Sequence, residues 1–281
     1  MTEKLIEGNP KQGEMITRMI KDIEHIKQKK GCICDMDGVM YHGSRLLPGA
    51  KEFVEWLTQN NKKFLFLTNS SERSPRELSE KLSRLGLDVP EDHFYTSAIA
   101  TAAFLASQTP HGSAYVIGEA GLINAIYAAG LSMNDVDPDY VVVGETPSYT
   151  YDRIKRAVSL VLGGAKLIGT NPDMTAPAEE GIIPATKALI SPIELTTGKQ
   201  AYFIGKPNPL MMKHAMKLLG AAPDEIVIIG DRMDTDIIAG IESGIETTLV
   251  LTGVTNTENI ELFPYRPTYI LDGIFEITKQ A

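Results

Sequence analysis

Two aspartates, Asp35 and Asp37, follow a short apolar segment directly in the stretch "GCICDMDGV", and Gly38 comes next. On an extended backbone, residues i and i+2 point to the same side, so both carboxylates can face one point just beyond a strand. Taken alone, this pattern also fits an ordinary polar turn, in which Asp and Gly supply the turn chemistry. The residues that follow the other apolar segments distinguish a site from a turn.

Polar groups follow three further apolar segments. Thr68 and Asn69 follow "KKFLFL", Lys206 follows "AYFIG", and Asp231 and Asp236 follow "EIVIIG". Ligands bind beyond the carboxyl ends of strands in open parallel sheets, so we expect these groups at one rim. Separately, Lys206 fits a solvated lysine before a turn, and Thr68 fits a helix cap. Four compatible strand ends together indicate one shared site.

Several carboxylates at one rim repel each other unless a cation lies among them. A hard divalent ion with oxygen ligands, Mg2+ by preference, fits this need and leaves room for phosphate and water. An aspartate can then attack phosphorus to form an aspartyl phosphate, while a neighbouring acid protonates the leaving alkoxide. A lysine and hydroxyl donors stabilise the transferring phosphoryl group. The pattern therefore predicts phosphoryl-transfer chemistry.

Strand and helix patterns alternate from residue 31 onward and must position these groups. The helix predicted after "LTNSS" begins with Ser74, Pro75 and Glu77, a capping box with proline at the first helical position. Such alternation predicts an α/β fold with a doubly wound parallel sheet and helices on its faces. No low-complexity linker interrupts the sequence.

The alternation restarts in mid-chain, which indicates a second α/β unit inserted into the first. We expect a core formed by residues 31–97 and 199–281, and an inserted unit over 98–198. Residues 1–30 are polar, with apolar residues at helical spacing, and predict an amphipathic helical extension.

Composition limits the partners. The chain has 281 residues, and 27 basic minus 36 acidic residues gives a net charge of -9, which disfavours nucleic acids and anionic membranes. No apolar run approaches the roughly 20 residues that span a bilayer, and the first residues lack a signal-peptide pattern. We therefore expect a cytoplasmic protein. Its two cysteines, Cys32 and Cys34, are expected to pack as small apolar side chains.

The segments "DMDGV", "LTNSS", "GKPNP" and "GDRMDTDI" resemble, in this order, the four motifs of the haloacid dehalogenase (HAD) superfamily. The long insertion, with "VVVGETPSY" and "TNPD", is similar to subclass IIA, the NagD-type phosphatases with a C2-type α/β cap. This resemblance covers roughly residues 31–272 and implies a Rossmann-like core.

The resemblance implies a role for each carboxylate. Asp35 would be the nucleophile and a metal ligand, and Asp37 would be the general acid and base, with its backbone carbonyl on the metal. Asp231 would be the second carboxylate ligand, and Asp236 would orient the metal waters or Lys206.

The resemblance also implies how substrate is held. Thr68 and Asn69 would bind the phosphate, and Lys206 would neutralise both the nucleophile and the phosphoryl group. The inserted cap would select the leaving group through a loop over residues 170–187; the candidate specificity residues are Thr170, Asn171, Asp173 and Lys187.

Lys187 stands where similar proteins often have glycine. A lysine here fits a solvated surface position. If its side chain instead faces the site, it would favour a substrate with a second anionic group.

The expected function is a Mg2+-dependent phosphomonoesterase for small metabolites such as nucleoside monophosphates or sugar phosphates. Phosphoglycolate, pyridoxal phosphate and p-nitrophenyl phosphate are alternative substrates that the resemblance suggests. A phosphomutase and a non-catalytic phosphometabolite sensor are further alternatives. The expected partner is a small phosphate ester, and homo-oligomer formation is left open.

Overall fold

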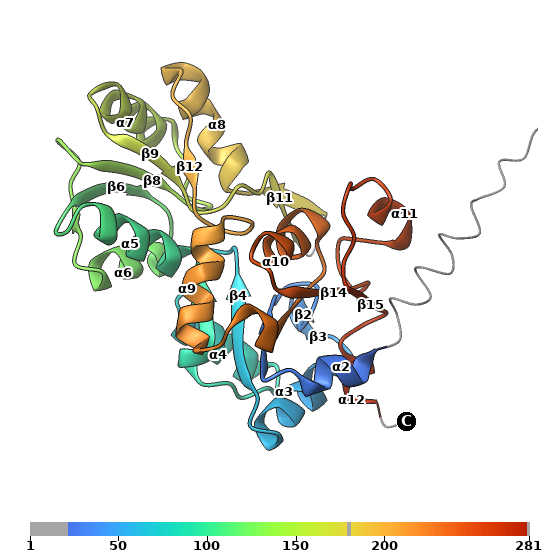
Figure 1. Ribbon diagram of the computed structural model, residues 1–281. Helices are drawn as coiled ribbons and strands as arrows, with labels where there is room; N and C mark the ends of the chain where they lie inside the picture. The colour runs from blue at the N-terminus through green and yellow to red at the C-terminus, as the bar shows by residue number, and fades with distance from the viewer. Residues whose placement is uncertain (1–21, 179–180, 280–281) are drawn as a thin grey trace, which may run out of the picture.

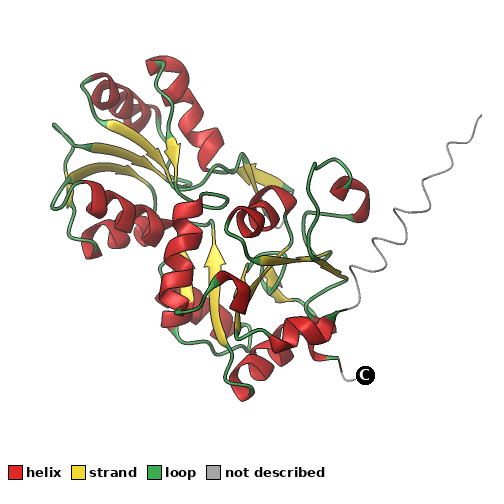
Figure 2. Cartoon of the chain, viewed as in Figure 1, coloured by secondary structure: helices red, strands yellow, loops and turns green. Residues whose placement is uncertain are grey.

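The computed structural model describes residues 22–178 and 181–279, which form two parallel sheets with helices on both faces of each (Figures 1 and 2). The predicted amphipathic extension over residues 1–30 lies mostly outside the described residues. Its described part ends in the short helix α2 (Ile23–Gln28). Among the described helices, none has the length and apolar character to cross a membrane.

The larger sheet has six strands in the order β15-β14-β13-β1-β4-β5, and every neighbouring pair is parallel. These strands are β1 (Gly31–Cys34), β4 (Lys63–Thr68), β5 (Phe94–Thr96), β13 (Ile226–Gly230), β14 (Glu246–Val250) and β15 (Tyr269–Leu271). From β1 the chain proceeds outward through β4 to β5, and it later returns to β13 on the other side of β1. This reversal forms a switch point at the carboxyl ends of β1 and β13, where ligands bind in such sheets.

Alternating side chains of β1 pack on opposite faces of the larger sheet. Cys32 and Cys34 belong to one apolar cluster, together with helices α2, α3 (Ala50–Gln59), α4 (Pro75–Arg84) and α12 (Phe275–Thr278). Ile33 belongs to the opposite cluster, which includes helices α5 (Ser97–Gln108), α9 (Pro209–Leu219) and α10 (Ile238–Glu242). Both cysteines are buried and free, as the sequence predicts.

The smaller sheet has five parallel strands in the order β12-β9-β8-β6-β7. They are β6 (Ser113–Ile117), β7 (Ser132–Met133), β8 (Tyr140–Val143), β9 (Lys166–Gly169) and β12 (Tyr202–Phe203). Helices α5 and α6 (Ala120–Ala128) pack on one face, and α7 (Tyr151–Leu162) and α8 (Thr186–Thr197) pack on the other. This sheet corresponds to the predicted inserted unit.

One strand pairs differently from the prediction. The segment "AYFIG" was expected in the core, but Tyr202 and Phe203 pair with Ile168 and Gly169 of β9 in the smaller sheet. The backbone continues alongside β9 until the Gly205 N–H donates to the Thr170 carbonyl at 2.8 Å. The chain therefore returns toward the larger sheet some residues after the expected boundary at 198. The remaining boundaries stay predictions.

Two small hairpins were not predicted as strands. One consists of β2 (Tyr41–His42) and β3 (Arg45–Leu46), and the other of β10 (Thr175–Pro177) and β11 (Ile182–Pro184). After β13, a π-helical turn, η3 (Met233–Ile237), precedes α10. Short 3-10 helices, η1 (Glu91–His93) and η2 (Pro223–Glu225), and the helix α11 (Thr257–Ile260) complete the described elements.

Candidate active site

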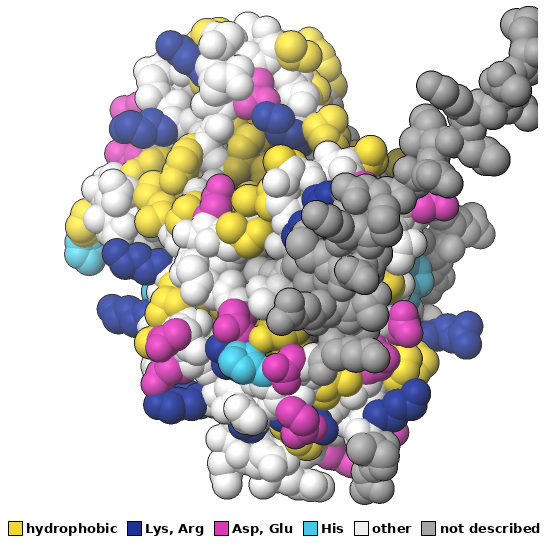
Figure 3. All heavy atoms as spheres, turned by 45° about the vertical axis from the view of Figure 1, so that its right-hand side comes forward, with side chains coloured by type: hydrophobic (Ala, Val, Ile, Leu, Met, Phe, Trp, Pro, Cys, Tyr) yellow, Lys and Arg dark blue, Asp and Glu magenta, His cyan; other side chains and the backbone are white. Residues whose placement is uncertain are grey.

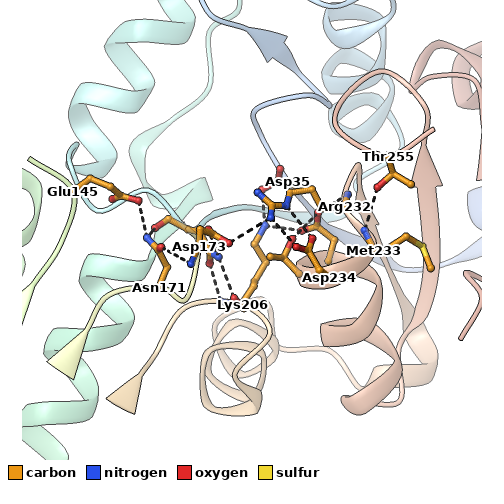
Figure 4. Close-up of polar contacts among 12 residues, drawn as sticks. Asp35, Glu145, Asn171, Asp173, Lys206, Arg232, Met233, Asp234 and Thr255 are labelled. Carbon is orange, nitrogen blue, oxygen red and sulfur yellow. Dashed lines mark hydrogen bonds and ion pairs between the residues drawn. The ribbon is translucent and has the colours of Figure 1, made fainter. Parts of the chain in front are cut away.

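Lys206 lies between two carboxylates at the switch point of the larger sheet (Figure 4). Its ammonium donates to Asp35 Oδ1 at 2.5 Å and to Asp236 Oδ1 at 2.6 Å, and also to the Leu67 carbonyl at 3.2 Å. Burial alone lowers the pKa of Lys206, but Asp236 and Asp35 outweigh this effect and raise it above the ordinary value. The lysine therefore carries a positive charge at neutral pH.

The position of Asp35 follows from the sheet. The Asp35 N–H donates to the Ile229 carbonyl at 2.8 Å and so extends the pairing of β1 with β13 by one residue. The Asp35 side chain is only 12% exposed and lines a cavity. Burial raises the pKa of its carboxyl, and the Lys206 ammonium opposes this rise.

Asp231 completes a buried cluster of three carboxylates with Asp35 and Asp236, whose oxygens lie within 4.8 Å of one another. Asp231 Oδ2 accepts from the Val254 N–H at 2.7 Å, whereas Oδ1 is buried and has no hydrogen-bond partner among the described residues. Burial and the neighbouring Asp236 raise the pKa of Asp231 to about 7. Within this described cluster, one ammonium faces three carboxylates, so the site lacks positive charge.

A hard divalent cation fits this donor set. All candidate ligand atoms are oxygens, which Mg2+ prefers, and the partnerless Asp231 Oδ1 is a free ligand atom within the described part of the chain. Two glycines leave space beside Asp231: a methyl group at Gly38 would lie 2.6 Å from Asp231 Oδ2, and one at Gly253 would lie 2.0 Å from the same atom. Gly38 also has a φ of 81°, which favours glycine.

Asp37 lies at the wall of the same cavity, and its side chain is 41% exposed. Its carboxylate lies 3.6 Å from His42 Nδ1, on the β2–β3 hairpin. Partial burial raises the pKa of Asp37, while Lys81 and His42 act in the opposite direction. A carboxyl with a raised pKa that faces the cavity can hold a proton for transfer.

Thr68 ends β4 and Asn69 follows it, and both residues line the cavity. Thr68 Oγ1 accepts from the Ser70 N–H at 3.1 Å. The Asn69 side chain is already occupied by protein groups: Oδ1 accepts from the Lys206 N–H at 2.7 Å, and Nδ2 donates to the Lys206 carbonyl and to Asp173. The side chain of Asn69 therefore connects protein segments and is not free to hold a phosphate.

The four candidate specificity residues separate in space. Asp173 lines the cavity. Thr170 and Asn171 are fully buried outside the cavity wall: Thr170 bonds to Ser71 and Thr186, and Asn171 bonds to the Asn69 carbonyl and Glu145. Their role is to pack the segment after β9 against the segment after β4.

Lys187 lies outside the set of cavity-lining residues. Its ammonium pairs with Glu194 at 3.3 Å and lies 4.6 Å from the centre of the Phe203 ring. The side chain is 31% exposed, so Lys187 is neither fully solvated nor directed into the cavity. The position of Lys187 therefore gives no support for a substrate with a second anionic group.

The cavity has a volume of about 900 Å3 and lies between the two sheets. On the side of the larger sheet it is lined by Asp35, Asp37, Thr68, Asn69, Lys206 and Asp231. On the other side, Glu145, Asp173 and the β10–β11 hairpin line it, the last with Ala176, Pro177 and Ile183. When the phosphate of an ester lies beside Asp35, its leaving group would therefore contact the mainly apolar β10–β11 hairpin.

Several charged residues of the cavity wall were missed from the sequence: Glu72, Arg73, Lys81, Arg84, Glu145 and Arg232. Glu145, after β8, accepts from the Ser71 N–H at 2.9 Å, the Ser71 hydroxyl at 2.7 Å and Asn171 Nδ2 at 2.7 Å. Arg232 makes two hydrogen bonds to Asp234, at 3.0 and 2.8 Å, and lies 3.8 Å from Asp173. The positions of Glu145 and Arg232, each two residues after an apolar strand, were the available signal.

Comparison with known proteins agrees with this geometry. A family model of haloacid dehalogenase-like hydrolases matches residues 32–132, and one of HAD-hydrolase-like proteins matches residues 203–277. Dihydroxyacetone phosphatase of Corynebacterium glutamicum is 46% identical over 245 residues, which cover 87% of this chain and 89% of the relative.

Ribonucleotide monophosphatase NagD of Escherichia coli is 41% identical over 248 residues, 88% of this chain and 98% of NagD. The solved NagD structure superposes with a TM-score of 0.83 and covers 89% of this chain and 98% of that one. A 4-nitrophenylphosphatase from Thermotoga maritima gives a TM-score of 0.87 at 33% identity, with 91% and 98% coverage.

The doubly wound sheet, the inserted smaller sheet and the group of Asp35, Lys206 and Asp231 at the switch point define a phosphoric monoester hydrolase. The chain belongs to the haloacid dehalogenase-like hydrolases, and within them to the NagD-type phosphatases of subclass IIA.

Proposed function

We propose that this phosphatase hydrolyses phosphate monoesters of small metabolites with Mg2+ and through a phosphorylated Asp35. The observation that carries the proposal is the buried Asp35 carboxylate, held by the Lys206 ammonium at 2.5 Å and facing a large cavity. A fixed carboxylate beside a permanent positive charge is suited to attack phosphorus, because the ammonium offsets the repulsion between two anions.

In the first step, a carboxylate oxygen of Asp35 forms a bond to phosphorus while the bond from phosphorus to the ester oxygen breaks. Asp37 gives its proton to the departing oxygen. In the second step, Asp37 takes a proton from water, the water oxygen bonds to phosphorus, and the Asp35–phosphate bond breaks. Lys206 and the groups at the carboxyl end of β4, including Thr68, balance the charge of the phosphoryl oxygens in both steps.

Asp35, Asp231 and the backbone carbonyl of Asp37 would hold Mg2+, with Asp236 orienting its waters and Lys206. When bound, the ion supplies positive charge next to the transferring phosphoryl group. The partnerless Asp231 Oδ1 and the excess of buried carboxylates over ammonium groups, both within the described cluster, support this assignment.

The cavity and the charges around it support the proposed substrate class. Nucleoside monophosphates and sugar phosphates are the proposed substrates, and the names of the relatives support small phosphate esters. On the face in Figure 3, acidic and basic side chains of the described residues are interspersed, and the net charge is -9. Neither feature favours a polyanionic partner. Phosphoglycolate, pyridoxal phosphate and p-nitrophenyl phosphate are alternatives in the same class.

The deciding experiment measures release of inorganic phosphate from a panel of phosphate esters, with Mg2+ and with EDTA, for the wild type and Asp35→Asn. We expect Mg2+-dependent turnover that Asp35→Asn abolishes. Retained turnover in Asp35→Asn would overturn the covalent mechanism, and a wild type without turnover would favour a sensor. Sugar bisphosphates in the panel identify a phosphomutase, which would interconvert isomers without net phosphate release.

A further inference from the structure

Asn69 connects three chain segments that are distant in the sequence. Its side-chain Oδ1 accepts from the Lys206 N–H at 2.7 Å, and Nδ2 donates to the Lys206 carbonyl at 3.0 Å and to Asp173 Oδ2 at 2.9 Å. Its backbone carbonyl accepts from Asn171 Nδ2 at 2.8 Å and from Ser97 Oγ at 2.5 Å. The carboxamide thus contacts both sides of the Lys206 peptide backbone.

The crossing of these segments depends on close packing. A methyl group on Gly205 would lie 2.7 Å from Asn69 Oδ1, 2.8 Å from Asn171 Cβ and 2.8 Å from the Thr170 carbonyl. The glycine therefore permits the segments after β4, β9 and β12 to touch. At such a crossing, a shift of one segment changes the positions of the other two.

Among the residues after β9 that reach this crossing, Asp173 is the one that contacts the Asn69 carboxamide. Its carboxylate accepts from Asn69 Nδ2 at 2.9 Å and lies 3.8 Å from Arg232, which follows β13 of the larger sheet. Figure 4 shows Asp173 between Lys206 and Asn171, on the side of Lys206 away from Met233. Asp173 therefore contacts groups that follow two strands of the larger sheet.

Resting on the proposed function, we propose that Asn69 is a positioning residue that couples Lys206 to the smaller sheet through Asp173. When the segment after β9 holds the Asn69 carboxamide through Asp173, the carboxamide fixes the Lys206 backbone, and the ammonium stays aligned with Asp35. The alignment of the catalytic lysine thereby depends on the position of the smaller sheet.

Asn69→Asp tests this coupling because aspartate keeps the acceptor for the Lys206 N–H but loses both donors and faces Asp173 with a second negative charge. We expect kcat/KM to fall about 100-fold, the effect of a misplaced catalytic group. Asn134→Asp is the matched control: its Oδ1 accepts from backbone N–H groups in an exposed turn, and it should behave as the wild type.

The double variant Asn69→Asp/Asp173→Asn restores a donor and an acceptor between the two side chains. We expect the kcat/KM of the double variant to be about tenfold higher than that of Asn69→Asp, because residues in contact show coupling of this size. The proposal would be overturned if kcat/KM of Asn69→Asp stays within threefold of the wild type. It would also be overturned if kcat/KM of the double variant is no higher than that of Asn69→Asp.

Asp173→Ala keeps the test informative if the Asn69 variant does not fold. Coupling through Lys206 predicts that kcat falls by a similar factor for p-nitrophenyl phosphate and for a bulkier nucleotide ester. If Asp173 only contacts the leaving group, KM will rise for the larger ester alone, and the proposal is wrong.

Hydrogen–deuterium exchange gives a readout that needs no turnover. In Asn69→Asp, peptides over residues 169–174 and 204–208 should exchange faster than in the wild type, and the double variant should restore the first of them. Unchanged exchange in Asn69→Asp overturns the coupling. Absence of wild-type phosphatase activity bears on the proposed function alone.

Discussion

The Glu145 carboxylate accepts two hydrogen bonds from Ser71, at 2.9 Å from the backbone N–H and at 2.7 Å from the hydroxyl. A third bond comes from Asn171 Nδ2 at 2.7 Å. One oxygen takes both bonds from Ser71, and the other takes the bond from Asn171. The Glu145 N–H also donates to the Ser71 hydroxyl at 3.3 Å. Glu145 thus fixes the end of the segment after β4 against the smaller sheet, and its side chain contributes acceptor atoms only.

Glu145→Gln should destabilise the fold by about 1–3 kcal/mol, because the new amide N–H must face one of these donors without an acceptor. Burial raises the pKa of the Glu145 carboxyl and outweighs the hydrogen bonds from Ser71 and Asn171, which act in the opposite direction. A raised folded-state pKa stabilises the wild-type fold at lower pH, and this stabilisation is lost as the pH rises through that pKa.

Urea unfolding of the wild type and Glu145→Gln at several pH values measures both effects. Glu145→Gln has no carboxyl at this position and should lack this pH-dependent stabilisation. The difference in free energy of unfolding between the wild type and Glu145→Gln should therefore shrink toward high pH. A difference that grows with pH would contradict the assignment.

Mg2+ should raise the thermal unfolding temperature of the wild type, and EDTA should reverse the rise. A ligand at 100 times its dissociation constant stabilises a fold by about 2.7 kcal/mol. Asp231→Asn should remove most of this shift, because it replaces the carboxylate whose Oδ1 has no partner among the described residues. Asp234→Asn is the control: this carboxylate is 52% exposed and bonds to Arg232, so the shift should remain. If Mg2+ raises the unfolding temperature of Asp231→Asn and Asp234→Asn equally, Asp231 is not a ligand of the ion.

Lys206→Met should abolish turnover and cost about 3–5 kcal/mol of stability, the cost of breaking a buried ion pair by removing one partner. Without the ammonium, which holds the pKa of Asp35 down, the folded-state pKa of Asp35 rises further, so protonation at low pH relieves the repulsion among the buried carboxylates. The loss of stability relative to the wild type should therefore be smaller at pH 5 than at pH 8. Unfolding curves at the two pH values check this, and a pH-independent loss would show that packing dominates.

Asp37→Asn should slow departure of the leaving group while Asp35 keeps its carboxylate. The defect should be large for alkyl phosphates, where general acid catalysis contributes about 10²–10⁴-fold. It should be smaller for p-nitrophenyl phosphate, whose leaving group needs little protonation. Steady-state rates on both esters test this, and equal defects would argue that the substitution acts through structure and not through proton transfer.

The positions of the site residues along the chain were predictable because parallel strands place their carboxyl ends at one rim. The structure brings Asp35, Lys206, Asp231 and Asp236 together, as expected from the residues after each apolar segment. The capping box of α4 is also present: Ser74 accepts from the Glu77 N–H, and the Glu77 carboxylate accepts from the Ser74 N–H.

Contacts that depend on the relative placement of the two sheets were not predictable. The segment that contains Tyr202 has the same apolar character in either sheet, so its pairing with β9 depends on tertiary packing. The contacts of Lys187 with Glu194 and Phe203 likewise depend on how α8 packs. The use of Asn69 as a connector appears only once its three partners are in space.

Both ends of the segment that forms the smaller sheet lie against Asn69. Ser97 Oγ donates to the Asn69 carbonyl, and Gly205 packs on the Asn69 side chain. Because the segment leaves and rejoins the larger sheet at neighbouring points, its length can change without separating β4 from β1. Away from residues 169–174, insertions and deletions between these two points should therefore be tolerated far better than in the connections within the larger sheet. The outer part of the segment can then diverge in evolution while the phosphate chemistry stays constant.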